Sequence, residues 1–161
     1  MKQEIEAPGS ITAAEIQQQP ELWPDTLERV RARLSRGPLI AGGAQVIIAG
    51  AGTSAYAATA VEAAWPRARA VPTTDLLPDP ALAAGADVML SLARSGNSPE
   101  SVGSVDGVRR AFPEIRHVAI TCNGDGRLAH HASVEPLLLD PRTNDRSLVM
   151  TSSFSNLVLA G

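Results

Sequence analysis

The stretch VMLSLARSGNSPESV, residues 88–102, passes from an apolar run into a short polar loop and then into the start of a helix. A strand that is buried on both faces of a parallel sheet is continuously apolar, as residues 88–93 are. Ser98, followed by Pro99 and Glu100, is typical of the first residues of a helix. The stretch therefore predicts a strand, a polar loop and a helix in immediate succession.

The same order occurs twice more in the chain. QVIIAGAGTSAYAATAVEAAW, residues 45–65, precedes this stretch, and RHVAITCNGDGRLAHHA, residues 116–132, follows it as a shorter version. Alternating strands and helices, with crossovers long enough for parallel pairing, predict an α/β fold. We expect a three-layer α-β-α sandwich around a five-stranded parallel sheet, with strands near 45–49, 68–72, 87–92, 116–121 and 134–139.

The segments on either side complete this organisation. Residues 1–11 have no periodicity and are predicted to be a mobile arm. Residues 12–43 are predicted to form two helices, the first capped by Thr12 with Glu15 in a capping box and ended by Pro20. Residues 44–161 form the α/β domain, whose last helix lies in SLVMTSSFSNLVLAG, residues 147–161, and reaches the end of the chain.

Composition narrows the possible functions. The chain has 161 residues, of which 44% are hydrophobic and 3% aromatic, and its net charge is −3. This predicts one sizeable core and gives no reason to expect nucleic acid or an anionic membrane as a partner. The N-terminus lacks the apolar stretch of a signal peptide, so a cytoplasmic location is expected. Cys122 is the only cysteine, and neither a metal site nor a cofactor is predicted.

The polar loops are the candidate binding site. In an open parallel sheet, the loops that follow the carboxyl ends of the strands gather at one edge, where ligands bind. Backbone N–H groups and the helix dipole at such a loop favour an anion. Ser95 and Ser98 bracket Gly96 and Asn97, and Thr53 with Ser54 supplies the same kind of group from the first loop. This set of donors suits a phosphate, and the neighbouring Arg94 adds a cation.

Simpler interpretations of these loops remain open. Taken alone, Ser98 is better explained as a helix cap than as a ligand. The GAG of residues 50–52 resembles a dinucleotide-binding fingerprint, which requires glycine at the position of Ala55; alanine is sometimes tolerated there, so the motif is weak but not excluded. A Walker loop is excluded because the chain has no lysine after Lys2.

Other polar residues carry weaker signals. His130 and His131 are predicted to lie on a solvated helix face, His117 to be structural, and Cys122 to be a buried thiol. The loop DPRTNDR, residues 140–146, is as consistent with an exposed turn as with a substrate-facing loop.

Taken in order, the motifs resemble the sugar isomerase (SIS) domain, a fold that binds phosphorylated sugars. GAGTSA, then SLARSGNSPES about forty residues later, then ITCNGDGRLA and MTSSF, follow the order of that family. EIQQQPELW is similar to the stretch that precedes the isomerase domain of glutamine–fructose-6-phosphate aminotransferase. RSGNSPESV, ITCN and DRSLVMTSS are more similar to the bacterial branch of tagatose-6-phosphate ketose/aldose isomerases and galactosamine-6-phosphate deaminases/isomerases. The resemblance covers about residues 12–160.

The resemblance implies a set of binding residues. Ser54 would contact the sugar, Ser95 and Ser98 would hold the phosphate, and the third binding segment would fall near residues 151–152. Two family donors differ here, because Arg94 replaces a common glutamine and Ala93 replaces a serine. The predicted sugar-phosphate site comprises Thr53, Ser54, Arg94, Ser95, Gly96, Asn97, Ser98, Thr151 and Ser152.

The predicted function is that of a phosphosugar-binding domain of an amino-sugar-phosphate isomerase or deaminase. Such an enzyme converts an amino-sugar 6-phosphate to a ketose 6-phosphate and releases ammonia. The resemblance implies a pair of SIS domains with catalytic groups in the second, so this chain alone is expected to be incomplete as an enzyme. Glu100, Asp140 and Asp145 are the carboxylates near the loops, but none has the environment of a base, and no catalytic residue is assigned. The alternative is a non-catalytic, sugar-phosphate-sensing regulatory module; a homodimer is expected in either case.

Overall fold

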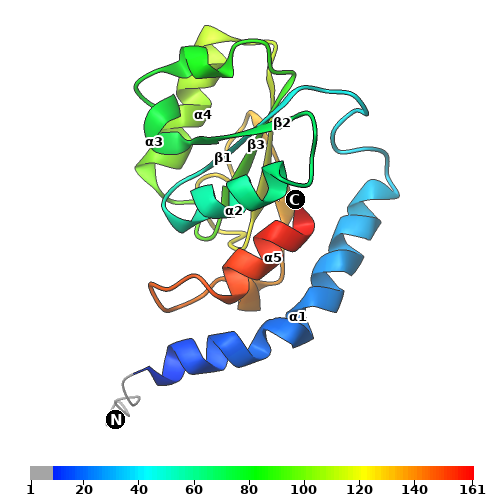
Figure 1. Ribbon diagram of the computed structural model, residues 1–161, viewed down its shortest axis with the longest axis vertical. Coiled ribbons are helices and arrows are strands. Elements are labelled where there is room, and N and C mark those ends of the chain that lie inside the picture. The colour runs from blue at the N-terminus through cyan, green and yellow to red at the C-terminus, as the bar shows by residue number, and fades with distance from the viewer. Residues whose placement is uncertain (1–8) are drawn as a thin grey trace.

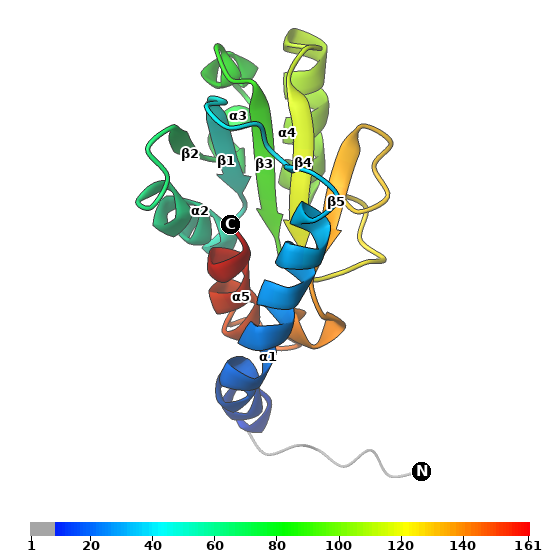
Figure 2. The ribbon, with the colours of Figure 1, turned by 90° about the vertical axis from the view of Figure 1, so that its right-hand side faces the viewer.

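The computed structural model describes residues 9–161, which form a five-stranded parallel sheet with helices on both faces. The strand order is β2-β1-β3-β4-β5, and every pairing is parallel. The predicted α/β class, three layers and strand positions are confirmed (Figure 2). The strands are β1 (Val46–Gly50), β2 (Ala68–Pro72), β3 (Val88–Ala93), β4 (Arg116–Thr121) and β5 (Val134–Leu138).

The helices divide into two layers that bury opposite faces of the sheet. On one face, α1 (Ser10–Leu34), α2 (Thr53–Glu62) and α5 (Ser152–Ala160) cover a core that includes Ile48, Leu90 and Leu157 (Figure 1). On the other face, α3 (Thr73–Leu76) and α4 (Pro99–Ala111) cover a second core, to which Met89 and Val105 belong. Short 3₁₀ helices span Pro80–Ala83 and Pro141–Thr143. Across the described residues, no helix is long and apolar enough to cross a membrane.

The N-terminal region differs from its prediction. One helix, α1, replaces the two expected helices, and Pro20 and Pro24 lie inside it. It begins at Ser10, after Gly9 with φ +81°, so Thr12 is not its cap. Packing against α5 holds the helix through both prolines, because Leu22 and Thr26 are buried there. The helix bends near its middle instead of ending (Figure 1).

The third predicted repeat also lacks its helix. Residues 122–133, which follow β4, form turns that lead directly into β5. Leu128 N–H donates to the Gly96 carbonyl over 2.9 Å, so this segment packs against the loop after β3 and does not coil into a helix. His130 and His131 therefore lie in turns and not on a helix face. The predicted arm falls mainly on residues 1–8, outside the described residues, and Ser10 and Ile11 belong to α1.

Candidate phosphosugar site

A small cavity of about 160 Å³ lies at the carboxyl ends of β1 and β3. From β1 the chain crosses to β2 on one side, whereas β3 lies on the other side, so the cavity occupies the point where the winding of the sheet reverses. Ligands of open α/β sheets bind at this position. The cavity is lined by Ala51, Ser54, Leu92, Ala93, Arg94, Ser95, Gly96, Ser98, Ser101 and Met150.

The first loop brings the start of α2 close to the end of β1. A Cβ at Gly50 would lie 2.4 Å from the carbonyl carbon of Ser54, so only glycine permits this approach. Ser54 is buried at the cavity, and its hydroxyl donates to the Met150 sulfur over 3.8 Å. Thr53 is exposed as the first residue of α2 and is not part of the lining.

The loop after β3 is held in place by the segment that follows β4. Gly96 has φ +64°, a left-handed conformation that favours glycine. The Ser95 hydroxyl accepts from Asn97 N–H over 3.3 Å, and the Ser95 carbonyl accepts from the Asn123 amide over 2.9 Å. Leu128 N–H binds the Gly96 carbonyl. The segment after β4 thus holds the backbone of the predicted phosphate loop, and Ser95 and Gly96 of this loop line the cavity.

Ser98 is the N-cap of α4 and also lines the cavity. Its hydroxyl oxygen accepts from Ser101 N–H over 3.3 Å and donates to the Ser101 hydroxyl over 2.6 Å. The capping interpretation is therefore confirmed, and it leaves the hydroxyl at the cavity wall. Ser101, which lies one turn into α4, was missed from the sequence; its spacing of three residues from Ser98 is the signal that could have found it.

Arg94 is half-buried at the cavity, and its guanidinium donates to the Ser147 carbonyl over 2.6 Å. Thr151 and Ser152 are not part of the lining. Thr151 N–H donates to the Asp145 carboxylate over 2.9 Å, and the Ser152 hydroxyl donates to the Glu15 carbonyl over 2.7 Å. The segment before α5 reaches the cavity through Met150, which sequence reasoning did not single out.

Two of the three carboxylates near the loops, Asp145 and Asp140, are engaged in structural contacts. Asp145 is buried and accepts hydrogen bonds from the N–H groups of residues 151–153, which caps α5. Asp140 hydrogen-bonds with Arg142, which lowers the pKa of Asp140. Glu100 lies in the first turn of α4. None of the three lines the cavity.

The thiol and the imidazoles offer no nucleophile at this cavity. Burial raises the pKa of Cys122 to about 12, as expected for an inert thiol. His131 contacts Asp106 over 3.3 Å on the α4 face of the sheet. His117 is buried in β4.

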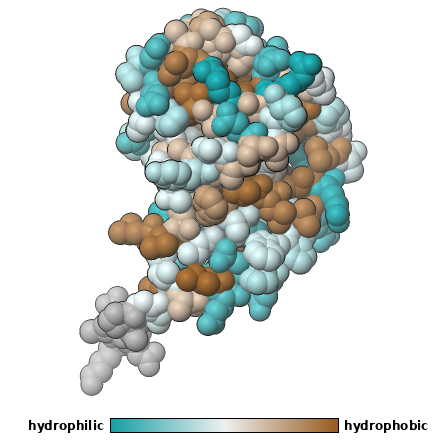
Figure 3. Space-filling model, in the orientation of Figure 1, coloured by the Kyte–Doolittle hydropathy of each residue, from teal (hydrophilic) through white to brown (hydrophobic). Residues whose placement is uncertain are grey.

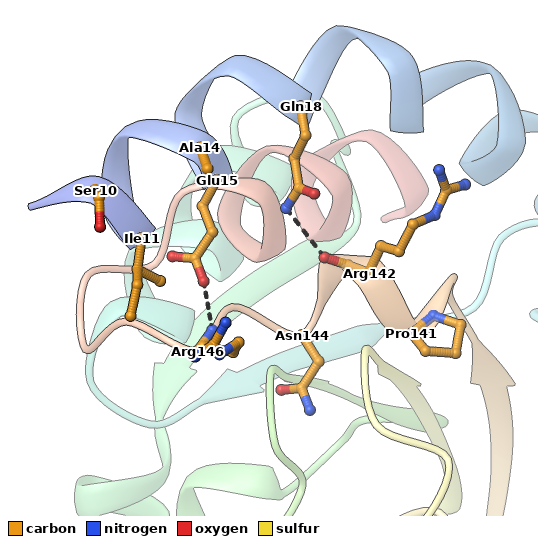
Figure 4. Close-up of a pocket in the computed structure, with 9 residues that line it drawn as sticks. All are labelled: Ser10, Ile11, Ala14, Glu15, Gln18, Pro141, Arg142, Asn144 and Arg146. Carbon is orange, nitrogen blue, oxygen red and sulfur yellow. Dashed lines mark hydrogen bonds between the residues drawn. The ribbon is translucent and has the colours of Figure 1, made fainter. Parts of the chain in front are cut away.

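The loop of residues 140–146 faces a second, larger cavity of about 640 Å³ beneath the first half of α1 (Figure 4). Glu15 and Gln18 descend into it from the helix and hydrogen-bond to the backbone of Arg146 and Arg142. This loop is therefore bound to α1 and is not a free turn.

A doubly wound sheet with a hydroxyl-lined cavity at its switch point defines the class of open α/β domains, which bind ligands at this position. Known proteins agree with this class, although no protein-family model matches the chain. It is 40% identical to a Streptomyces coelicolor protein described as a candidate D-galactosamine-6-phosphate deaminase, over 92% of this chain and 43% of the relative. It is 35% identical to the D-galactosamine-6-phosphate deaminase of a Shewanella species, over 92% of this chain and 44% of the relative.

A solved structure gives the same result. A candidate tagatose-6-phosphate ketose/aldose isomerase from Clostridium novyi superimposes with a TM-score of 0.79 and 34% identity, over 93% of this chain and 43% of that chain. The chain belongs to the sugar isomerase (SIS) domain family, as its motifs predict, and to the branch of these deaminases and isomerases. It spans less than half the length of these relatives.

Proposed function

We propose that the cavity between β1 and β3 binds the phosphate group of an amino-sugar 6-phosphate. The observation that carries the proposal is that Ser54, Ser95, Ser98 and Arg94 line one cavity at the switch point of the sheet. Galactosamine 6-phosphate is the first substrate to test, since it appears in the names of the relatives.

The size of the cavity supports a phosphate and not a whole sugar. Its volume of about 160 Å³ is below the roughly 300 Å³ at which pockets for whole small molecules begin. We expect the phosphate to occupy the cavity and the sugar to extend past its mouth. Hydroxyl and backbone donors, with one guanidinium, satisfy a phosphate dianion without a metal ion.

In the complete protein, the reaction would convert the amino sugar to a ketose 6-phosphate and release ammonia. Ring opening precedes removal of the C2 proton, which gives an enolamine; its imine tautomer is then hydrolysed. A base for this step must lie within hydrogen-bond reach of the C2 proton. Asp140 and Asp145 accept hydrogen bonds from backbone N–H groups, so neither is assigned as this base. We propose that the described residues bind and orient the substrate. We leave the proton-transferring group unassigned.

Calorimetric titration of the chain with galactosamine 6-phosphate tests the proposal. We expect saturable binding that weakens about tenfold in Ser95→Ala, because one hydrogen bond to a charged group is lost. Ser35→Ala, at the exposed end of α1, is the matched control and should bind as the wild type does. A folded chain that gives no heat with any hexose 6-phosphate, or a Ser95→Ala variant that binds normally, would contradict the proposal.

A regulatory sensor would bind the same phosphate, so binding alone does not separate the two functions. Release of ammonia by the full-length protein supports the enzyme, and binding without turnover supports the sensor. We further propose a cytoplasmic location, in which phosphorylated sugars are available, and a homodimeric assembly.

A further inference from the structure

The loop of residues 145–151, which leads into α5, forms one wall of the phosphate cavity. Met150 lines the cavity and contacts Ser54. The Ser147 carbonyl accepts the hydrogen bond from the Arg94 guanidinium over 2.6 Å. The position of this loop therefore determines where the Arg94 guanidinium lies at the cavity.

No apolar burial fixes the tip of this loop. Leu148 is 93% exposed and Val149 is 57% exposed, so neither contributes to the core. Met150 packs against the core and anchors the loop on the cavity side. The stretch around Ser147 has no such anchor, so its hydrogen bonds determine where the Ser147 carbonyl lies.

Glu15, which lies on α1, accepts several of the hydrogen bonds that hold this loop. Its carboxylate is buried, with the residue only 6% exposed, and one oxygen accepts from Arg146 N–H over 2.6 Å and from Ser147 N–H over 3.2 Å. The other oxygen accepts from the Ser147 hydroxyl. Figure 4 shows Glu15 reaching from α1 toward Arg146. Asp145 holds the far end of the loop by binding the N–H groups of residues 151–153.

We propose that Glu15 is a positioning residue for the phosphate site, acting through Ser147 on Arg94. This inference rests on the proposed function, because it gives the first helix a part in binding the phosphate. One carboxylate oxygen accepts two N–H groups, and the other meets the Ser147 hydroxyl, which also lies 2.9 Å from the Val149 carbonyl. Hydrogen bonds to a charged acceptor are stronger than those to a neutral one, so a glutamine of the same size would hold the loop and the Ser147 carbonyl less firmly.

The position of Arg94 can be measured without any ligand. In ¹⁵N–¹H spectra of the free chain, the Arg94 Nε–H signal is assigned by its loss in Arg94→Lys. We expect Glu15→Gln to shift or broaden this signal, and Ser147→Ala, which removes one of the three donors, to shift it less. Glu28→Gln, at an exposed position of the same helix, should leave it unchanged. An unchanged Arg94 signal in a folded Glu15→Gln variant would overturn the proposal.

Ligand affinity supplies the second test. We expect Glu15→Gln to weaken binding of galactosamine 6-phosphate about fivefold, and expect this loss to disappear when Arg94→Ala is already present. An effect that persists in the Arg94→Ala background would mean that Glu15 acts by another route, and would also overturn the proposal. If the wild type binds no hexose 6-phosphate, the proposed function fails, while the Arg94 signal still decides whether Glu15 positions this side chain.

Discussion

His117 is a residue of β4, and its imidazole is buried, which is unusual for this side chain. Its two ring nitrogens have no hydrogen-bond partner within residues 9–161. Burial, followed by the charges of His131 and Arg109, lowers the pKa of His117 to about 4, and Asp106 opposes the shift weakly. Above about pH 4 the folded state therefore favours the neutral ring.

This burial predicts an acid-sensitive stability. Between pH 6.5 and about 4 the unfolded chain protonates His117 but the folded chain does not, so the free energy of unfolding falls as the pH falls through this window. From pH 7 to pH 5 we expect a loss of about 1–2 kcal/mol, which His117→Leu removes. Urea denaturation at each pH measures it. Glu135 and Asp140, whose pKa values are lowered, add losses only below their usual range near pH 4. Equal pH slopes for the two proteins would contradict the prediction.

The contact between β1 and α2 sets the first wall of the cavity. Gly50→Ala would place a methyl group against the backbone of Ser54, since a Cβ there meets its carbonyl carbon at 2.4 Å. Because backbone cannot yield as a flexible side chain does, we expect a loss of about 3 kcal/mol in the free energy of unfolding by urea denaturation. Gly42→Ala is the control, because its Cβ would have no atom within 4 Å. Similar stabilities for both variants would show that α2 can move aside.

Elements with a strong local signal could be predicted from the sequence. The five strands lie within two residues of their expected positions. For the three central strands β1, β3 and β4, the reason is that buried parallel strands are continuously apolar. Pro20 misled the prediction of α1, because contacts with α5, more than a hundred residues later, keep the helix intact. The turns after β4 were read as a helix because their binding to Gly96 has no signature in local periodicity.

The site residues also differ in how well the sequence predicts them. Ser54 and the loop of residues 94–98 follow strands, so topology alone brings them to one edge of the sheet. Met150 and Glu15 were missed as site residues because their roles depend on the path of a loop whose tip contributes nothing to the core. The hydrogen bonds between Glu15 and Ser147 join residues 132 positions apart, and no spacing rule predicts such a pair.

At the scale of the whole molecule, the first and last helices pack against each other on one face of the sheet (Figure 1). Contacts of α1 with α5 link the first helix to the last, and Arg33 of α1 pairs with Glu135 of β5. Figure 3 shows hydrophobic side chains over the loop before α5 and over α5 itself. Leu148 and Val149 of this loop are 93% and 57% exposed, and Tyr56 of α2 is 73% exposed.

These exposed side chains are the surface on which we expect the proposed homodimer to form, because a second copy would remove their apolar area from water. Sedimentation velocity at micromolar concentrations should give a dimer for the wild-type chain. The double variant Leu148→Asp, Val149→Asp should weaken association at least about tenfold, since burying a carboxylate in an interface is costly. Leu77→Ser, at the end of α3 on the opposite face, is the control and should leave the dimer intact. A wild-type chain that stays monomeric at these concentrations would count against the homodimer, and a dimer that survives the double variant would place its interface elsewhere.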